Sequence, residues 1–186
     1  MPIFTEHLRE ELGVIHFGLA QLGSARQSLL QGEAANIQDL RIVTYALRLL
    51  LKRSHLVKLE SLLYPEIDPL DLDDEGFEKF SEQTERLYNG QARLQLMRLQ
   101  LALDSFDERS SRDELARCIE DCVHVIDHVL DHETNIIFPL ADRVLSPAKQ
   151  KDLYTKAQDL DHKQAIERMQ ATQALLNMDL ARASGS

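Results

Sequence analysis

Apolar residues recur every three or four positions along most of the chain, which is the spacing of one face of an α-helix. The first such run covers residues 3 to 31, and the second covers residues 37 to 63. Further runs follow at about 75 to 106, 112 to 137 and 147 to 181. The pattern therefore predicts a chain built from long amphipathic helices.

The segments between these runs contain residues that end or begin helices. Gln31-Gly32-Glu33 separates the first two runs, and Ser146-Pro147 offers a cap and a first-turn proline to the last one. The acidic segment from Pro65 to Asp74 is the one long connection. Because short connections make successive helices antiparallel neighbours, we expect an all-α fold. Its expected form is an up-down four-helix bundle with an additional C-terminal helix, in a single domain over residues 1–186.

Three glycines, Gly13, Gly18 and Gly23, lie inside the first predicted helix. Each costs roughly 1 kcal/mol of helix stability relative to alanine. We expect close approach of a neighbouring helix to offset this cost.

Composition narrows the classes of partner. The chain has 186 residues, 44% of them hydrophobic and 28% charged, which are the values of a globular domain. A net charge of −10 argues against nucleic acid, because binding it requires cations that neutralise phosphates. No apolar run is long enough to span a membrane, and no targeting segment is recognised. Cys118 and Cys122, one helical turn apart, are interpreted as reduced thiols of a cytoplasmic protein.

Three of the seven histidines share one face of the fourth predicted helix, because His124, His128 and His132 are spaced by four. Apolar residues surround them, so this face is expected to contact protein. Buried imidazoles need hydrogen-bonding partners, and a metal ion is one such partner. The alternative is a solvated stripe, which Asp127 and Asp131 would share.

A sequence pattern occurs twice. Residues 55–65 contain His55, Glu60 and then Tyr64-Pro65. Residues 128–139 contain His128, Glu133 and then Phe138-Pro139. Both copies end at an aromatic residue followed by proline, which is expected to stop or disturb the helix. The repetition suggests a duplicated helical hairpin with a site between its halves.

With these endings, and with the Leu8–Glu11 opening of the first helix, residues 5 to 155 resemble the hemerythrin-like (HHE cation-binding) family. The resemblance implies a four-helix bundle that holds two irons with histidines and carboxylates. It also implies functions of that family, which are dioxygen or nitric oxide binding, iron sensing and repair of damaged iron–sulfur clusters.

The sequence departs from the family pattern at most ligand positions. Of the usual ligand set, the resemblance leaves His55 and Glu133. Apolar side chains stand at the other positions and are expected to meet in the bundle interior as a plug: Leu12, Leu59, Leu87 and Val129.

Residues equally distant in sequence from a turn are expected to lie at the same level of two antiparallel helices. Applied to each turn, this rule predicts a rearranged metal site. Glu60 and Glu133 would then supply oxygen ligands, and His132 would be a ligand or would hydrogen-bond to one. Four imidazoles would supply the nitrogen ligands: His16, His55, His128 and His162. His7 is expected at the surface, and no catalytic residue is assigned.

Imidazole with carboxylate suits several metals. The resemblance favours non-haem iron, diiron or mononuclear, with zinc or no metal as alternatives. The first hypothesis is therefore a metal-binding protein that binds or senses dioxygen, nitric oxide or iron. The second is a metal-free regulatory or structural bundle that has lost the diiron site. A diiron enzyme is disfavoured because the chain has no Glu-x-x-His pair. The partners considered are a small gas and a second copy bound through a helix face.

Overall fold

The computed structural model describes residues 3–33, 36–67, 81–107 and 111–184. All regular secondary structure within these ranges is helical, which confirms the all-α prediction. None of the helices in the described ranges is both long and apolar enough to cross a membrane.

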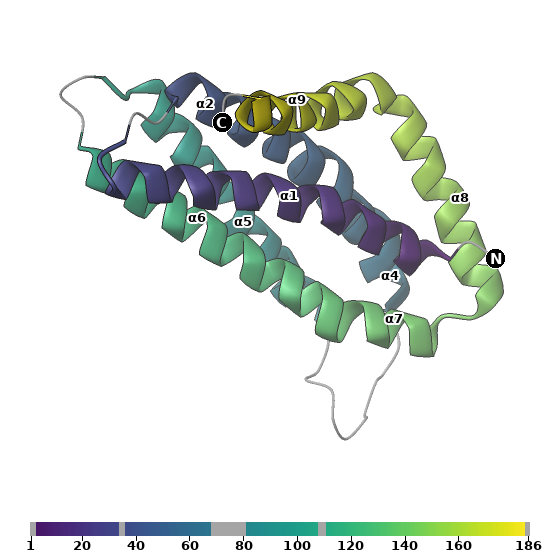
Figure 1. Cartoon of the computed structure of the whole chain (residues 1–186). Coiled ribbons are helices and arrows are strands. Elements are labelled where there is room, and N and C mark those ends of the chain that lie inside the picture. Colours follow the sequence, from purple (N-terminus) through teal and green to yellow (C-terminus); the bar gives the residue numbers. More distant parts are fainter. Residues whose placement is uncertain (1–2, 34–35, 68–80, 108–110, 185–186) are drawn as a thin grey trace.

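Long helical rods form the body of the molecule (Figure 1). The first rod is α1 (Phe4–Leu30), and the third is α5 (Glu82–Asp104). The second rod runs without interruption through α2 (Ile37–Leu47), η1 (Arg48–His55), α3 (Leu56–Lys58), η2 (Leu59–Leu63) and α4 (Tyr64–Ile67). The fourth consists of α6 (Arg112–His132), η3 (Glu133–Ile137) and α7 (Phe138–Val144). Two further helices follow, α8 (Pro147–Lys163) and α9 (Ala165–Ser184).

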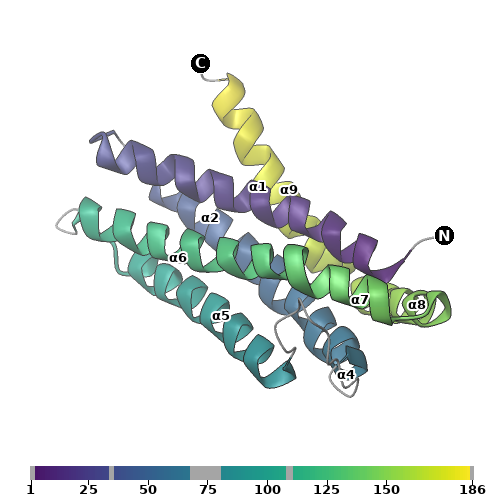
Figure 2. The ribbon, with the colours of Figure 1, turned by 90° about the horizontal axis from the view of Figure 1, so that it is seen from below.

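The rods pack around one apolar core. Helix α1 contacts α2 and α6, and α5 contacts the same two helices (Figure 2). Fully buried side chains from all four rods fill the space between them, among them Ile15, Leu51, Leu99 and Ile126. Helix α8 packs on α1, and α9 packs on α2 and η1.

Tyr64-Pro65 does not stop its helix, contrary to expectation, whereas Phe138-Pro139 disturbs its helix as expected, without ending it. The second rod continues past Tyr64-Pro65 to Ile67, and the fourth continues past Phe138-Pro139 to Val144. Each pair is preceded by a π-helical segment, η2 or η3. Proline has no N–H and its ring displaces the carbonyl one turn earlier, so local widening lets the helix continue. The repeated sequence pattern therefore corresponds to a repeated helix distortion.

The last predicted helix, 147 to 181, is divided in two at Gln164, whose φ is −109° and ψ is 6°. The cap is as predicted, because the Ser146 side chain accepts a hydrogen bond from the Lys149 N–H. Neither glycine nor proline marks the break. The break turns α9 across the bundle, where Ala171 and Leu175 are buried.

Close helix approach is confirmed at Gly18. A Cβ atom there would lie 2.7 Å from Leu47 Cδ2 and 3.5 Å from Leu175 Cδ1, so α1, α2 and α9 meet at this point. A Cβ atom at Gly13 or Gly23 would meet nothing within 4 Å in the part of the chain that the structure describes, so close approach within it does not explain those two glycines.

The third rod differs from the prediction in where its described helix begins and in the exposure of one plug residue, Leu87. The described helix begins at Glu82 rather than near residue 75, and residues 75–80 lie outside the described residues, as do residues 68–74 of the long connection. The burial predicted for the apolar plug is confirmed for Leu12, Leu59 and Val129. It is wrong for Leu87, which is 63% exposed. Glu85 is buried instead, and two residues correspond to about 200° around a helix.

Candidate functional site: a buried network of ion pairs

His55 joins three rods in the middle of the core. It is the last residue of η1 and is fully buried. Its Nε2 lies 2.7 Å from Glu133 Oε2, and its Nδ1 lies 3.2 Å from Glu11 Oε2. Glu133 is the first residue of η3, and Glu11 lies on the inward face of α1. An imidazolium can donate to both carboxylates at once, whereas a neutral ring can donate to one.

His55, Glu11 and Glu133 stabilise the charged forms of one another. Burial alone would lower the pKa of His55, but the Glu133 carboxylate and the hydrogen bond to Glu11 outweigh it and raise the pKa to about 9. Burial would raise the pKa of Glu11, but the hydrogen bond and charge of His55, followed by Lys58, lower it to about 2. His55 is therefore an imidazolium at neutral pH.

Lys58 lies one turn beyond His55 and is 1% exposed. Its ammonium contacts Glu11 Oε1 and Asp161 Oδ1 directly. It also lies 3.3 Å from Ser54 Oγ and 3.4 Å from His7 Nε2. Burial lowers the pKa of Lys58 to about 8, although Glu11 partly opposes the shift.

Arg168 reaches the same carboxylates from α9. One guanidinium nitrogen lies 2.7 Å from Glu11 Oε1, and another contacts Asp161 Oδ1. The break at Gln164 makes this possible, because it turns α9 so that Arg168 returns to Asp161 near the end of α8. Glu11 is thus bound by three cations from two other parts of the chain, namely Arg168, Lys58 and His55.

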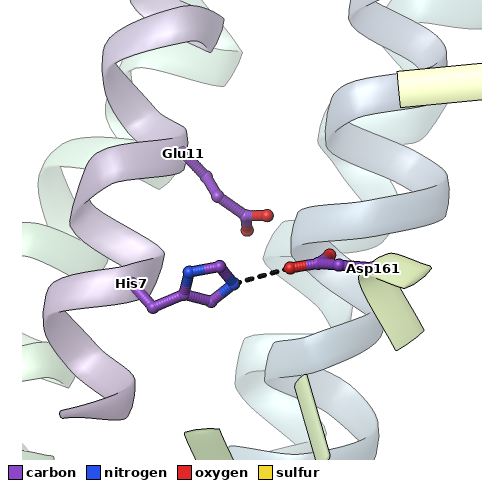
Figure 3. A group of neighbouring side chains, drawn as sticks. All are labelled: His7, Glu11 and Asp161. Carbon is purple, nitrogen blue, oxygen red and sulfur yellow. Dashed lines mark hydrogen bonds and ion pairs between the residues drawn. The ribbon is translucent and has the colours of Figure 1, made fainter. Parts of the chain in front are cut away.

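His7, Glu11 and Asp161 point toward one another (Figure 3). One nitrogen or oxygen atom from each lies within 4.8 Å of the others, and His7 Nε2 is 2.7 Å from Asp161 Oδ2. One imidazole and two carboxylates are suitable ligands for a divalent transition metal. Lys58 already contacts all three residues, so its ammonium takes the place that a metal ion would need. The residues as arranged therefore do not fit a resident metal.

Burial and then the charge of Lys58 lower the pKa of His7, although the Glu11 carboxylate opposes the shift. The Nε2 atom of a neutral His7 ring can donate to Asp161 or accept from Lys58, but one tautomer cannot do both. His7 was expected at the surface, yet its side chain is only 17% exposed.

Glu60 belongs to a separate cluster between the second and third rods. Arg93 binds it with two nitrogens, at 2.7 Å and 2.8 Å, and Asn89 donates to it at 3.1 Å. The Asn89 amide also lies 3.3 Å from the hydroxyl of buried Tyr64. Glu60 is therefore committed to an arginine rather than to His55.

The structure brings together some of the proposed ligands and not others. His55 contacts Glu133. Glu60 instead pairs with Arg93, and His132 Nε2 lies 3.1 Å from Glu85 Oε1. The remaining three histidines have exposed side chains: His16, His128 and His162. Within the described part of the chain, the four imidazoles therefore do not converge on one point.

The reason for this outcome is geometric. The number of residues between a histidine and the nearest turn indicates its level along the bundle axis, but not the direction of its side chain around its own helix. Ile15 and Val129 point inward, so their neighbours His16 and His128 point outward. His16 Nδ1 instead lies 3.8 Å from Asp127 Oδ1 near the surface.

Four members of the network were not among the predicted site residues: Glu11, Lys58, Asp161 and Arg168. Two of them had a recognisable signature. Glu11 adjoins Leu8, Leu12 and Ile15 on the apolar face of α1, and Lys58 lies among leucines. A charged residue where the helical period requires an apolar one indicates a buried partner of opposite charge.

Comparison with known proteins adds no family assignment. A scan against models of protein families finds no match to this chain, and a search of curated proteins finds no matching sequence.

Proposed function

We propose that this chain is a metal-independent regulatory or structural bundle of the hemerythrin-like type, in which its own cations replace the metal. The observation that carries the proposal is the position of the Lys58 ammonium, in contact with Glu11, Asp161 and His7. These are the residues that would otherwise bind a divalent ion.

The proposal includes the up-down arrangement of four helices. Support comes from the packing partners, because α1 contacts α2, the second rod contacts α5, α5 contacts α6, and α6 contacts α1. Such a closed cycle in chain order is expected when successive helices are antiparallel neighbours.

Charge balance supports the absence of metal. The network contains three carboxylates, Glu11, Glu133 and Asp161. It also contains three cations, His55, Lys58 and Arg168, so its formal charge is zero. An added divalent ion would leave two uncompensated positive charges in a buried site, which is unfavourable unless a protein cation leaves.

Metal analysis of the protein purified without added metal tests the proposal. We expect less than about 0.1 equivalent of iron or zinc, no absorption band between 320 and 500 nm, and the same melting temperature with and without a chelator. One or two equivalents of iron, together with a lower melting temperature after chelation, would refute it.

A metal-binding protein is the second candidate, because one group of three suitable ligands exists among the described residues. A buried Glu133 oxygen, Oε1, also has no hydrogen-bond partner among those residues. In this case Lys58 would lose its proton and withdraw, and non-haem iron or zinc would bind His7, Glu11 and Asp161. Binding or sensing of dioxygen, nitric oxide or iron in the cytoplasm belongs to this second candidate.

A further inference from the structure

Helix α5 has large apolar side chains on its outer face. The exposed fractions are 63% for Leu87, 39% for Leu94, 48% for Met97 and 60% for Leu101. Together with Gly90, these positions follow one another at intervals of three, four, three and four residues. This is the spacing of the contact seam of a coiled coil, so the side chains form one stripe along the helix. We call these five residues the α5 stripe.

Among the described residues, the side chains of this stripe do not belong to the buried core. Helix α5 packs on the second rod and on α6 through another face, which includes Ala92, Leu96 and Leu99. In Figure 2 it lies along the lower edge of the bundle. A contiguous apolar stripe on the outer side of a helix indicates an interaction surface.

A groove runs beside the middle of the stripe. It lies between α5 and η1 and is lined by apolar residues that include Gly90, Leu94 and Met97. Arg48 and Lys52 line its other side. A Cβ atom at Gly90 would meet none of the described residues within 4 Å, so the absence of a side chain there leaves the groove open.

The edges of the stripe are basic. Arg48 and Lys52 stand on the η1 side, and Arg98 adjoins Leu94 and Leu101 on the helix surface. Within the described residues these three cations form no ion pair, whereas Arg93 is paired with Glu60. This basic surface belongs to a chain with a net charge of −10.

We propose that the α5 stripe is the docking site for an acidic amphipathic helix of a partner protein. Leucine-like side chains of that helix would fill the groove at Gly90, and carboxylates beside them would pair with Arg48, Lys52 and Arg98. A second copy of this chain fits less well, because its stripe would bring a second set of cations against the first. The proposal concerns a different surface from the buried network and is independent of whether metal binds there.

The probe is a labelled peptide of about three heptads, with leucine at positions a and d and glutamate at positions e and g. Repulsion between glutamates disfavours its self-association. A matched peptide carries lysine in place of glutamate. We expect fluorescence anisotropy to show that the intact protein binds the acidic peptide at least about tenfold more tightly than the basic one. Affinity for the acidic peptide should fall as salt is added.

Two variants locate the binding site. Leu94→Glu places a charge in the stripe, and Gly90→Phe places a large side chain at the groove, where a Cβ atom would meet none of the described residues within 4 Å. Each should weaken binding of the acidic peptide by about tenfold or more. Leu30→Glu is the control, because Leu30 is 52% exposed on α1 and lies outside the stripe. Circular dichroism and the melting temperature verify that all three variants fold.

Three results would overturn the proposal. The first is no binding, or equal binding of the acidic and basic peptides. The second is unchanged affinity in Leu94→Glu and Gly90→Phe. The third is a dimer in sedimentation that Leu94→Glu dissociates, which would assign the stripe to a second copy of the chain.

Discussion

His55 Nε2 lies 2.7 Å from Glu133 Oε2, although 78 positions separate the two residues in the sequence. His55 ends one π-helical segment, and Glu133 begins another. Such segments often occur at functional sites, because the widened turn changes the direction of the side chains that follow. Here they aim two charged groups at each other in the core.

Removing the imidazole should destabilise the fold strongly. His55→Ala leaves the Glu133 and Glu11 carboxylates buried without one of their cations, so we expect a loss of about 3–5 kcal/mol in the free energy of unfolding. Urea denaturation measures it. His128→Ala is the matched control, because His128 is exposed and should change stability by less than about 0.5 kcal/mol. Similar losses in both variants would mean that the buried contact does not stabilise the protein.

Stability should depend on pH through His55 and Glu11. The pKa of His55 is raised to about 9, so its contribution is complete below about pH 6.5 and is lost as the pH rises through about 9. The pKa of Glu11 is lowered to about 2, so its contribution is complete above about pH 4.5 and is lost as the pH falls through about 2. Maximum stability is therefore expected between about pH 4.5 and 6.5.

The shifted pKa of Lys58 changes stability with rising pH in the direction opposite to that of His55. Its folded pKa of about 8 is below the ordinary value, so losing its proton between about pH 8 and 10.5 favours the folded state. The loss of folding stability due to deprotonation of His55 is on the order of 3 kcal/mol in full, and it should therefore be clearest between about pH 6.5 and 8. Denaturation at a series of pH values measures this decline. The variant His55→Gln should flatten it, and an equally steep decline in that variant would contradict the assignment to His55.

The periodicity of the sequence located the helices well, because the apolar face of a helix depends on neighbours three and four residues away. The family resemblance singled out His55 and Glu133, whereas the repeated pattern paired His55 with Glu60 and His128 with Glu133. The directions of His16 and Leu87 could not be obtained in this way. The number of residues from a turn gives the level of a residue along its rod. It does not give the direction of the side chain around the helix axis, and the spacing of residues in the sequence does not reveal where π-helical segments change that direction.

The rest of the network depends on tertiary structure. Arg168 reaches Glu11 only because the chain breaks at Gln164, and no proline or glycine predicts that break. Lys58 and Glu11 interrupt apolar faces, which predicts burial with some partner. The identity of that partner depends on how α8 and α9 fold back, and local sequence does not specify this.

Removing the ammonium of Lys58 should create a metal site. In Lys58→Ala, the ligand atoms of His7, Glu11 and Asp161 no longer face a competing cation from that position, so Zn²⁺ or Co²⁺ should bind and raise the melting temperature. Absorption of bound Co²⁺ reports the coordination directly. Lys52→Ala, which removes an exposed lysine, is the control and should gain no metal binding. If the unaltered protein binds Co²⁺ as tightly as Lys58→Ala, then Lys58 does not exclude the metal.

Two arginine contacts hold α9 on the bundle, and they should differ in strength. Arg53 pairs with Glu167 at 3.0 Å, but the two side chains are 61% and 49% exposed. Arg168 instead pairs with Glu11, whose side chain is 7% exposed, and with Asp161. An exposed pair contributes at most about 1 kcal/mol, whereas removing one partner of a buried pair leaves an uncompensated charge. Arg168→Gln should therefore accelerate amide hydrogen exchange in α9 by at least about tenfold, while Arg53→Gln should change it less than about threefold. Equal acceleration in the two variants would show that α9 is held by its apolar contacts at Ala171 and Leu175 rather than by the buried network.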